Sequence, residues 1–395
     1  MKKFISLIVL FLLLPFVQAW EGKICENIEY QKSIEAITIQ NSTVYAACSY
    51  RMVANSSGLI GIYYLGTIGA YKLDGTKLWE IDSGFVTKLV PWKEEILVGS
   101  MGGLLKLNSS GNYTGRFLTK YKLYDFTLDG DYAYLATGDV FSGESKGIVY
   151  KVNLSTMEEV WRVNLTEMAS RVRVGEVIYV GTGYPSGFVG KEKFGSVYGI
   201  SKDGKLLWNV SLGEWVRDIE VWNGKAVVGT GYGESGHVYI IDSQGRVVGN
   251  LTLFFVEDIL VSGNVAYVAG NRNVVTIDLD KKEILWKVQI PYRGKVLGLM
   301  DGRLLVGAGE FKEKNGTIYS VGSLYVIENG KIKGEMPVGY VRSMGISQDY
   351  IAIGTGSNTF IVLHKDEVLP SICGVGFFLV ASLLSIVGLK KFYNT

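Results

Sequence analysis

Residues 219–241, IEVWNGKAVVGTGYGESGHVYII, contain the pattern that decides the fold. An apolar position at Ile219 precedes the turn Asn223-Gly224, and a continuous apolar run, Ala226 to Gly229, follows it. Asn-Gly is a strong signal for a hairpin turn. A short continuous apolar run is typical of a strand buried on both faces. Because a further run follows at residues 238–241, the segment predicts consecutive antiparallel strands.

The same buried run recurs eight times, at intervals of 37 to 52 residues. The copies are residues 44–47, 96–99, 133–136, 178–181, 226–229, 266–269, 304–307 and 351–354. A third strand follows in most units, and a fourth strand often opens with Trp, as at Trp79, Trp161, Trp208 and Trp286. Four antiparallel strands repeated radially form a propeller blade. We therefore predict an all-β, eight-bladed β-propeller over residues 20–365.

The eighth unit lacks a fourth strand of its own, because the chain leaves the repeat after residues 360–363. The run Ile24 to Gln31, near the start of the predicted domain, is strand-like and belongs to no unit. We expect this N-terminal strand to complete the last blade, which removes the free sheet edges that invite aggregation. Seven blades with a loose terminal hairpin are the alternative.

Residues 1–19 have the features of a secretory signal peptide. Lys2 and Lys3 precede an apolar core, and Val17-Gln18-Ala19 has the small-x-small cleavage pattern. The mature chain would then begin at Trp20. An uncleaved anchor helix is the alternative.

The other end is predicted to lie in a membrane. A linker, residues 366–371, leads into the uncharged residues 372–389, which are long enough for a transmembrane helix. Lys390 and Lys391 follow, so residues 390–395 form a cytoplasmic tail and the propeller faces outward.

Charge and cysteine usage limit the possible functions. The chain has 40 basic and 38 acidic residues, and the two counts are equal once the ends are left out. A neutral domain lacks the basic surface by which proteins hold nucleic acid, so no nucleic-acid partner is expected. Cys25 and Cys48 either form a disulfide, which persists outside the cell, or remain as buried thiols. With no Cys/His cluster, the sequence predicts no metal site.

Nine Asn-x-Ser/Thr sequons fall in predicted turns or edge strands. They are Asn41, Asn55, Asn108, Asn112, Asn153, Asn164, Asn209, Asn250 and Asn315. Since a glycan is tolerated only on a solvent-facing side chain, the pattern predicts an outward-facing glycoprotein.

The turn-and-Trp element reads Leu73-Asp-Gly-Thr-Lys-Leu-Trp79 and Ser201-Lys-Asp-Gly-Lys-Leu-Leu-Trp208. It resembles the repeat of PQQ-like (pyrroloquinoline-quinone-type) propellers, in which the Trp docks neighbouring blades. That family includes quinone-dependent dehydrogenases and non-catalytic propellers of outer-membrane assembly. The dehydrogenases use calcium, a catalytic Asp and adjacent cysteines. This chain has no adjacent cysteines, and His237 and His364 are isolated. We therefore expect no catalytic residues and no cofactor; a divergent quinone- or metal-dependent oxidoreductase is the alternative.

The C-terminal tail has a resemblance of its own. Ile372-Cys373-Gly374, the apolar stretch and the two lysines are similar to the CGP-type sorting signal of archaeal surface proteins, although Val375 stands where that signal has Pro. The resemblance implies lipid attachment at Cys373. A plain single-pass anchor is the alternative.

A ring of polar positions precedes the first-strand apolar positions and is expected at the mouth of the central channel. Its members are Lys88, Asp125, Arg171, Asp218, Asp258 and Ser343. Three carboxylates there could bind a cation or a polar ligand. Alternatively, each carboxylate caps backbone amides between blades, with Arg171, Arg217 and Arg342 neutralising the charge.

The connections between second and third strands should all emerge on one face. Five are predicted to be long loops, residues 50–66, 138–146, 183–195, 231–236 and 309–321. They carry the aromatic residues Tyr63, Tyr64, Tyr184, Phe188, Phe194, Tyr232, Phe311 and Tyr319. Aromatic groups on loops of a rigid scaffold are typical of recognition surfaces; alternatively they pack together and cap the propeller.

From these features we predict a non-catalytic binding or scaffold propeller at the cell surface, with a protein or glycan partner. A subunit of a larger envelope complex is a third possibility.

Overall fold

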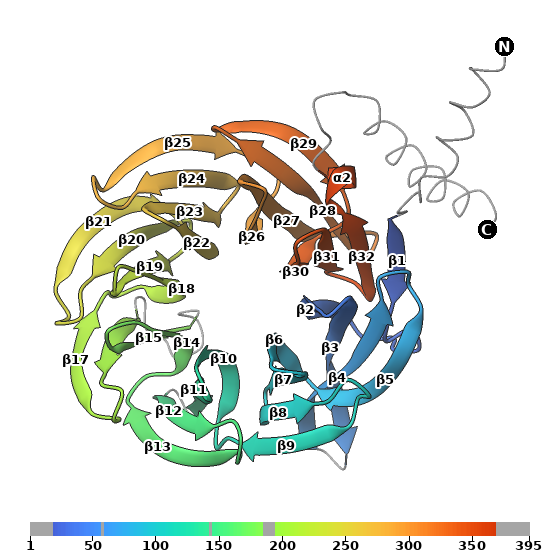
Figure 1. The fold of residues 1–395 in the computed structure, drawn as a ribbon, viewed down its shortest axis with the longest axis horizontal. Helices are drawn as coiled ribbons and strands as arrows, with labels where there is room; N and C mark the ends of the chain where they lie inside the picture. Colours follow the sequence, from blue (N-terminus) through green and yellow to red (C-terminus); the bar gives the residue numbers. More distant parts are fainter. Residues whose placement is uncertain (1–18, 57–58, 142–143, 185–193, 369–395) are drawn as a thin grey trace.

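The computed structural model describes residues 19–56, 59–141, 144–184 and 194–368. Within these residues the chain forms eight four-stranded sheets arranged in a closed ring around a central axis (Figure 1). The predicted eight-bladed propeller is therefore confirmed, and the seven-bladed alternative is wrong. The predicted membrane segment, residues 372–389, and Cys373 lie outside the described residues. None of the helices in the described part has the length and hydropathy to span a membrane.

Each blade runs from an inner first strand to an outer fourth strand. Blade 1 contains β2 (Lys32–Gln40), β3 (Thr43–Ser56), β4 (Leu59–Lys72) and β5 (Lys77–Gly84). Blade 2 contains β6 (Val86–Trp92), β7 (Glu95–Ser100), β8 (Gly103–Leu107) and β9 (Tyr113–Leu118). Blade 3 contains β10 (Lys122–Asp129), β11 (Tyr132–Phe141), β12 (Glu144–Asn153) and β13 (Glu158–Leu165). Blade 4 contains β14 (Ala169–Val174), β15 (Ile178–Thr182), β16 (Ser196–Ile200) and β17 (Leu206–Ser211).

The second half of the ring repeats this order. Blade 5 contains β18 (Trp215–Trp222), β19 (Lys225–Gly231), β20 (Ser235–Ile241) and β21 (Val247–Phe254). Blade 6 contains β22 (Asp258–Ser262), β23 (Val265–Gly270), β24 (Asn273–Asp278) and β25 (Glu283–Gln289). Blade 7 contains β26 (Gly294–Met300), β27 (Arg303–Lys314), β28 (Thr317–Glu328) and β29 (Lys331–Pro337). Blade 8 contains β30 (Val341–Ile346), β31 (Tyr350–Thr355), β32 (Thr359–His364) and β1 (Trp20–Lys23), and the helix α2 (Lys365–Val368) follows β32.

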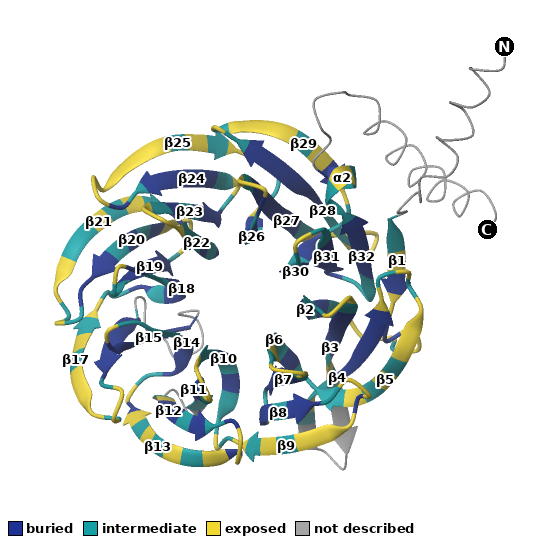
Figure 2. Ribbon diagram, viewed as in Figure 1, coloured by how far each residue is buried: buried dark blue, intermediate teal, exposed yellow. Residues whose placement is uncertain are grey.

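The apolar runs form the second strands, as predicted, and they are buried on both faces. In blade 5, Val227 and Val228 have no exposed surface although their side chains point to opposite sides of the sheet. Figure 2 shows this gradient in blades 2 to 7, with mostly buried middle strands and outer strands in which exposed and half-buried residues alternate. Each core cluster joins two neighbouring blades; one, for example, unites Ile240 of blade 5 with Val268 of blade 6. The hydrophobic core is therefore a series of clusters, each lying between two blades. It is complete only when the ring of blades is closed.

An N-terminal strand closes the ring, as predicted, but the predicted segment 24–31 is wrong. The closing strand is β1, in which Trp20 pairs with Val362 and Gly22 with Phe360. A Cβ on Gly22 would lie 2.2 Å from Cζ of Phe360, so only glycine fits against this ring. Cys25 then adopts a left-handed φ of 59° and is disulfide-bonded to Cys48 of blade 1. The chain therefore leaves the sheet before residues 24–31 could pair.

Tryptophans of the outer strands dock each blade onto the next one. The Trp79 indole packs on Gly111 in the next blade and donates its N–H to the carbonyl of Ser109 at 2.7 Å. Trp20 makes the same contact with Gly75 and donates to the carbonyl of Leu73 at 2.6 Å. The five such pairs are Trp20–Gly75, Trp79–Gly111, Trp161–Gly204, Trp208–Gly245 and Trp286–Gly330. Trp20 is thus the docking Trp of blade 8, and this sets the register of the closing strand.

Two joints use the opposite arrangement of large and small residues. In blades 2 and 5, Gly115 and Gly249 occupy the position of the docking Trp. The facing turns carry Met157 and Lys282, both with positive φ (57° and 61°), where the five Trp joints have glycine. A Cβ on Gly115 would lie 2.7 Å from Cγ of Met157. At these two joints the following blade therefore supplies the large side chain that fills the space between blades. At the Trp joints the preceding blade supplies it.

Candidate functional site

One face of the ring carries the links between blades and the connections from second to third strands; we call it the hairpin face. Three predicted long loops on it are hairpins, so the loop prediction is wrong for 50–66, 138–146 and 309–321. Strands β3 and β4 stay paired to Ser56↔Leu59, and β27 and β28 to Lys314↔Thr317. Continuous pairing satisfies the backbone groups of these long connections.

The remaining two predicted loops differ from each other. Residues 231–236 form a tight turn in which Tyr232 and Ser235 bond to each other. Most of 183–195 lies outside the described residues.

The predicted aromatic residues fall into two groups. Tyr63, Phe311 and Tyr319 are exposed on the hairpins. Tyr184 is buried against Phe194, with ring centroids 5.1 Å apart. Tyr64 and Tyr232 are partly buried, and Tyr64 lies edge-on to Phe85. Phe188 lies outside the described residues. Some of these aromatic residues therefore pack inward, as expected for a cap on the propeller. Others are exposed on the hairpins, as expected for a recognition surface.

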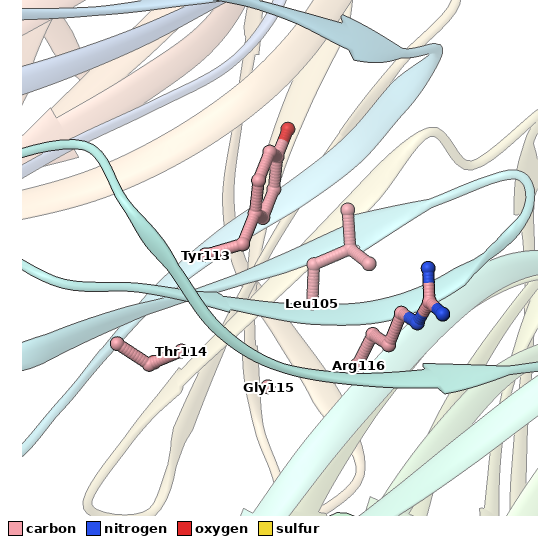
Figure 3. A pocket seen from close by; sticks show the side chains of 5 residues that line it. All are labelled: Leu105, Tyr113, Thr114, Gly115 and Arg116. Carbon is pink, nitrogen blue, oxygen red and sulfur yellow. The ribbon is translucent and has the colours of Figure 1, made fainter.

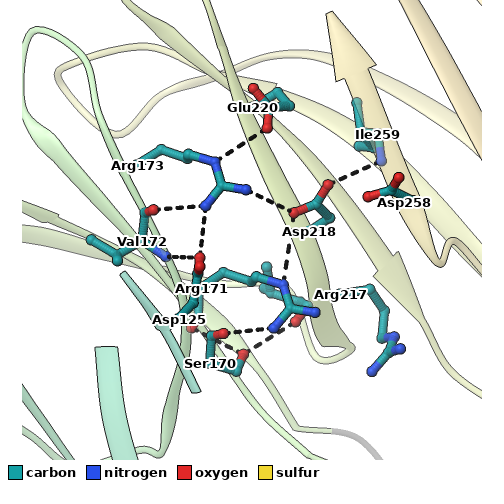
Figure 4. A network of polar contacts seen from close by, with 12 residues as sticks. Asp125, Ser170, Arg171, Val172, Arg173, Arg217, Asp218, Glu220, Asp258 and Ile259 are labelled. Carbon is teal, nitrogen blue, oxygen red and sulfur yellow. Dashed lines mark hydrogen bonds and ion pairs between the residues drawn. The ribbon is translucent and has the colours of Figure 1, made fainter. Parts of the chain in front are cut away.

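Five of the six predicted channel residues, all except Ser343, lie in one charged cluster around Arg173, a side chain that the sequence did not single out. Arg173 of β14 donates to Asp125 at 2.6 Å, to Asp218 at 3.4 Å and to Glu220 at 3.2 Å (Figure 4). Lys88 donates to the other oxygen of Asp125 at 2.8 Å. Burial opposes the charge of Asp125, but Lys88 and Arg173 outweigh it and hold the pKa of this carboxyl well below its usual range.

Asp258 lies in the opposite electrostatic situation. Its carboxylate accepts from the amide of Leu297 at 2.7 Å and lies beside Asp218 (Figure 4). Burial and the neighbouring charge of Asp218 raise the pKa of Asp258 well above its usual value. The neighbouring charge of Asp218 therefore favours the protonated form of Asp258.

The carboxylates also bond to backbone amides of the next blade. Asp125 accepts from Val172 at 3.2 Å, and Asp218 from Ile259 at 3.0 Å. Ser343 makes the related contact by donating to the carbonyl of Ile34 at 2.7 Å. These contacts match the alternative in which the polar residues of the ring cap backbone groups between blades.

A second ring of charges lies one residue earlier in the chain. In seven of the eight described blades the first strand has a register shift near its start, such as the one between Val216 and Asp218. Such a β-bulge turns an additional residue out of the ladder. The bulged residues include Glu35, Arg217, Lys295 and Arg342, and Glu257 occupies the equivalent position of blade 6. Strand alternation could have revealed Arg173 and Glu220, because they lie two residues after the predicted Arg171 and Asp218 and so share a face of the strand with them. The ring of bulged residues has no local signal in the sequence.

Glu257 is the centre of this second ring. It accepts from Arg217 at 2.6 Å and from Lys295 at 2.9 Å, and Arg293 lies 3.5 Å away. Burial opposes its charge, but Lys295 and Arg217 prevail and lower the pKa of Glu257 to about 2. Farther around the ring, Arg342 donates to both oxygens of Glu35.

Two cavities accompany these features. One, of about 690 Å³, opens on the hairpin face beside Arg293 and Phe311. The other, of about 460 Å³, lies on the outer rim of blade 2, over Leu105 between Tyr113 and Arg116 (Figure 3). The rim cavity contains none of the predicted site residues. In the described ranges, no three His, Cys, Asp or Glu side chains are placed to hold a metal ion. His237 contacts Glu214 at 2.9 Å, and His364 lies 3.3 Å from Asp366.

Eight blades in a closed ring, with Trp–Gly contacts at five of the joints, define a PQQ-like repeat propeller. A family model for the outer membrane protein assembly factor BamB matches residues 65–319, more than half of the chain. The chain therefore belongs to this family.

Solved structures share the fold at low sequence identity. BamB from Moraxella catarrhalis is 11% identical, with a TM-score of 0.58 over 87% of this chain and 98% of that one. Sqt1 from Saccharomyces cerevisiae is 10% identical, with a TM-score of 0.62 over 85% and 96%. Chaetomium thermophilum Sqt1, bound to the N-terminus of the ribosomal protein L10, is 11% identical, with a TM-score of 0.61 over 85% and 98%. No curated protein sequence matches the chain.

Proposed function

We propose that this chain is a non-catalytic scaffold propeller that binds a protein partner through its hairpin face at the outer surface of a membrane. The observation that carries the proposal is the pair of long hairpins, β3–β4 and β27–β28, which project exposed aromatic side chains from a closed ring. Large aromatic groups on a rigid support are efficient anchors for protein recognition, because little conformational entropy is lost on binding.

The channel supports a structural role over a catalytic one. The carboxyl groups of Asp125, Asp218 and Asp258 each accept a hydrogen bond from a backbone amide of the next blade, and Arg173 bridges the first two. These carboxylates hold blades together, so recruiting them for quinone or metal chemistry would break contacts between blades. Among the structural relatives, one Sqt1 propeller was solved with a peptide segment of L10, which fits a binding role for this architecture.

Export and anchoring complete the proposal. Six sequon asparagines are exposed, namely Asn41, Asn112, Asn164, Asn209, Asn250 and Asn315. Asn108 and Asn153 are half-buried and bond to their own turns, and the side chain of Asn55 is not described. We infer a cleaved signal peptide at 1–19, glycans at the exposed sequons, and anchoring through 372–389 or a lipid on Cys373.

Site-specific photo-crosslinking in native membranes tests the binding face. A photoreactive residue at Tyr63 or Tyr319 should crosslink to one shared partner protein. Leu207, on the outer strand of blade 4, is the matched control because its exposure (50%) is close to that of Tyr63 (51%). Equal crosslinking from Leu207, or crosslinks to glycan alone, would contradict a protein-binding hairpin face.

A further inference from the structure

The larger cavity, of about 690 Å³, lies where blades 5 to 8 meet the hairpin face. Its wall combines charged and aromatic groups: Glu234, Arg272, Arg293, Glu310, Phe311 and Tyr340. They come from the second-to-third-strand connections of blades 5, 6 and 7 and from the links that follow blades 6 and 7. The cavity is thus a product of the ring, since no single blade supplies it.

Positive charge exceeds negative charge around this cavity. Glu257, just inside the channel, is shared by Arg217, Lys295 and Arg293. At the rim, Glu310 is shared by two more cations, Arg272 at 2.9 Å and Lys312 at 3.5 Å. Burial lowers the pKa values of Arg217 and Lys295, and repulsion adds to the shift, from Arg171 on Arg217 and from Arg217 on Lys295, although Glu257 opposes it. An additional carboxylate would relieve this repulsion.

Arg293 is the cation best placed to receive it. Its side chain is 45% exposed, and its 3.5 Å contact is the longest of the three to Glu257. The guanidinium lies 5.7 Å from the ring centre of Phe255, which Arg217 also contacts, at 5.4 Å. The guanidinium therefore has an aromatic neighbour, and its fork of N–H donors suits a carboxylate.

The opposite wall offers an apolar surface and an open strand edge. Phe311 packs edge-on to Tyr340, with ring centres 5.2 Å apart, and keeps part of its own ring exposed. Pairing between β26 and β27 ends at Gly294↔Ala308, whereas β27 stays paired with β28 as far as Lys314. The edge of β27 from Glu310 to Lys314 therefore extends beyond its inner neighbour, as required for an added strand.

We propose that this cavity binds an extended acidic segment of a partner protein. An Asp or Glu side chain pairs with Arg293, its apolar neighbour packs on Phe311, and its backbone follows the open edge of β27. Glu234 and Glu310 in the wall repel negative charge. They therefore disfavour a dianion such as phosphate more strongly than a carboxylate, which carries a single charge. This inference rests on the proposed protein-binding function and assigns its recognition chemistry.

Selection from a phage-displayed random heptapeptide library, with the full chain as bait, tests the assignment. The wild-type chain should enrich Asp or Glu at one fixed position. Arg293→Glu should abolish that preference or exchange it for Lys or Arg, and Arg293→Gln should abolish it without reversing a charge. Arg116→Glu, an identical charge change at the rim cavity, is the matched control and should leave the preference unchanged.

The selected peptide then provides a quantitative measure. Replacing its acidic residue by the amide should weaken binding about 10- to 100-fold in the wild type, the range of a charge-assisted pair, and should have no effect in Arg293→Gln. The inference would be overturned if the selected peptides had no fixed acidic position or if no peptide were enriched. It would also be overturned if Arg116→Glu lost the acidic preference as fully as Arg293→Glu. Crosslinking from Tyr63, which lies on blade 1 away from the cavity of Arg293, does not depend on this site, so the proposed function can survive that failure.

Discussion

The joint between blades 2 and 3 offers a direct test of how neighbouring blades are held together. Gly115→Trp alone places an indole in space that Met157 occupies, because even a Cβ there would lie 2.7 Å from Cγ of Met157. Overpacking of this kind costs about 1–3 kcal/mol. Met157→Gly alone removes a buried side chain, at about 2–5 kcal/mol. It also relieves a left-handed backbone, which returns about 1–2 kcal/mol.

The double variant should behave differently from the sum of its parts. Trp at 115 facing Gly at 157 reproduces the arrangement at five other joints, so we expect stability close to wild type. The coupling free energy should then be about 2 kcal/mol or more, within the range found for residues in contact. A double-mutant cycle from urea unfolding, followed by far-ultraviolet circular dichroism, measures it.

A reverse exchange serves as the control for this experiment. Trp79→Gly with Gly111→Met, at the joint of blades 1 and 2, should show coupling of the same sign. If either double variant loses as much stability as its two single variants together, the two residues do not fill one shared space and the reasoning is wrong.

Three further predictions concern two buried carboxyl groups and the disulfide. The folded-state pKa of Glu257 is lowered to about 2, so its stabilisation is present above pH 4.5 and lost as pH falls towards 2. This amounts to about 3 kcal/mol, and Glu257→Gln should flatten that part of the stability–pH curve. The folded-state pKa of Asp258 is raised, so its contribution is lost as pH rises through that pKa; Asp258→Asn should be more stable than wild type in alkaline urea titrations. Replacing Cys25 and Cys48 by Ser opens a loop with a sequence separation of 23 and should cost about 3 kcal/mol, visible as a lower melting temperature; an unchanged melting temperature would contradict it.

The sequence by itself determined the repeat, the strand order and the eight blades. Each buried run, such as 226–229, is a local pattern, because a strand covered on both faces must be apolar along its whole length. The docking role of Trp79 and Trp208 was equally readable, since both follow a turn glycine at short range. The aromatic residues of the hairpin face were also found, because they lie within single connections.

Only the tertiary structure decided which side chains meet. Trp20 closes the ring because β1 pairs with β32, far away in the chain, and no local pattern records that pairing. Arg173 and Glu257 became centres of charge because residues from several blades converge on the channel, and β-bulges turn an unexpected residue toward it. Strand periodicity fixes what a residue does within its blade, whereas the contacts between blades depend on closure of the whole ring.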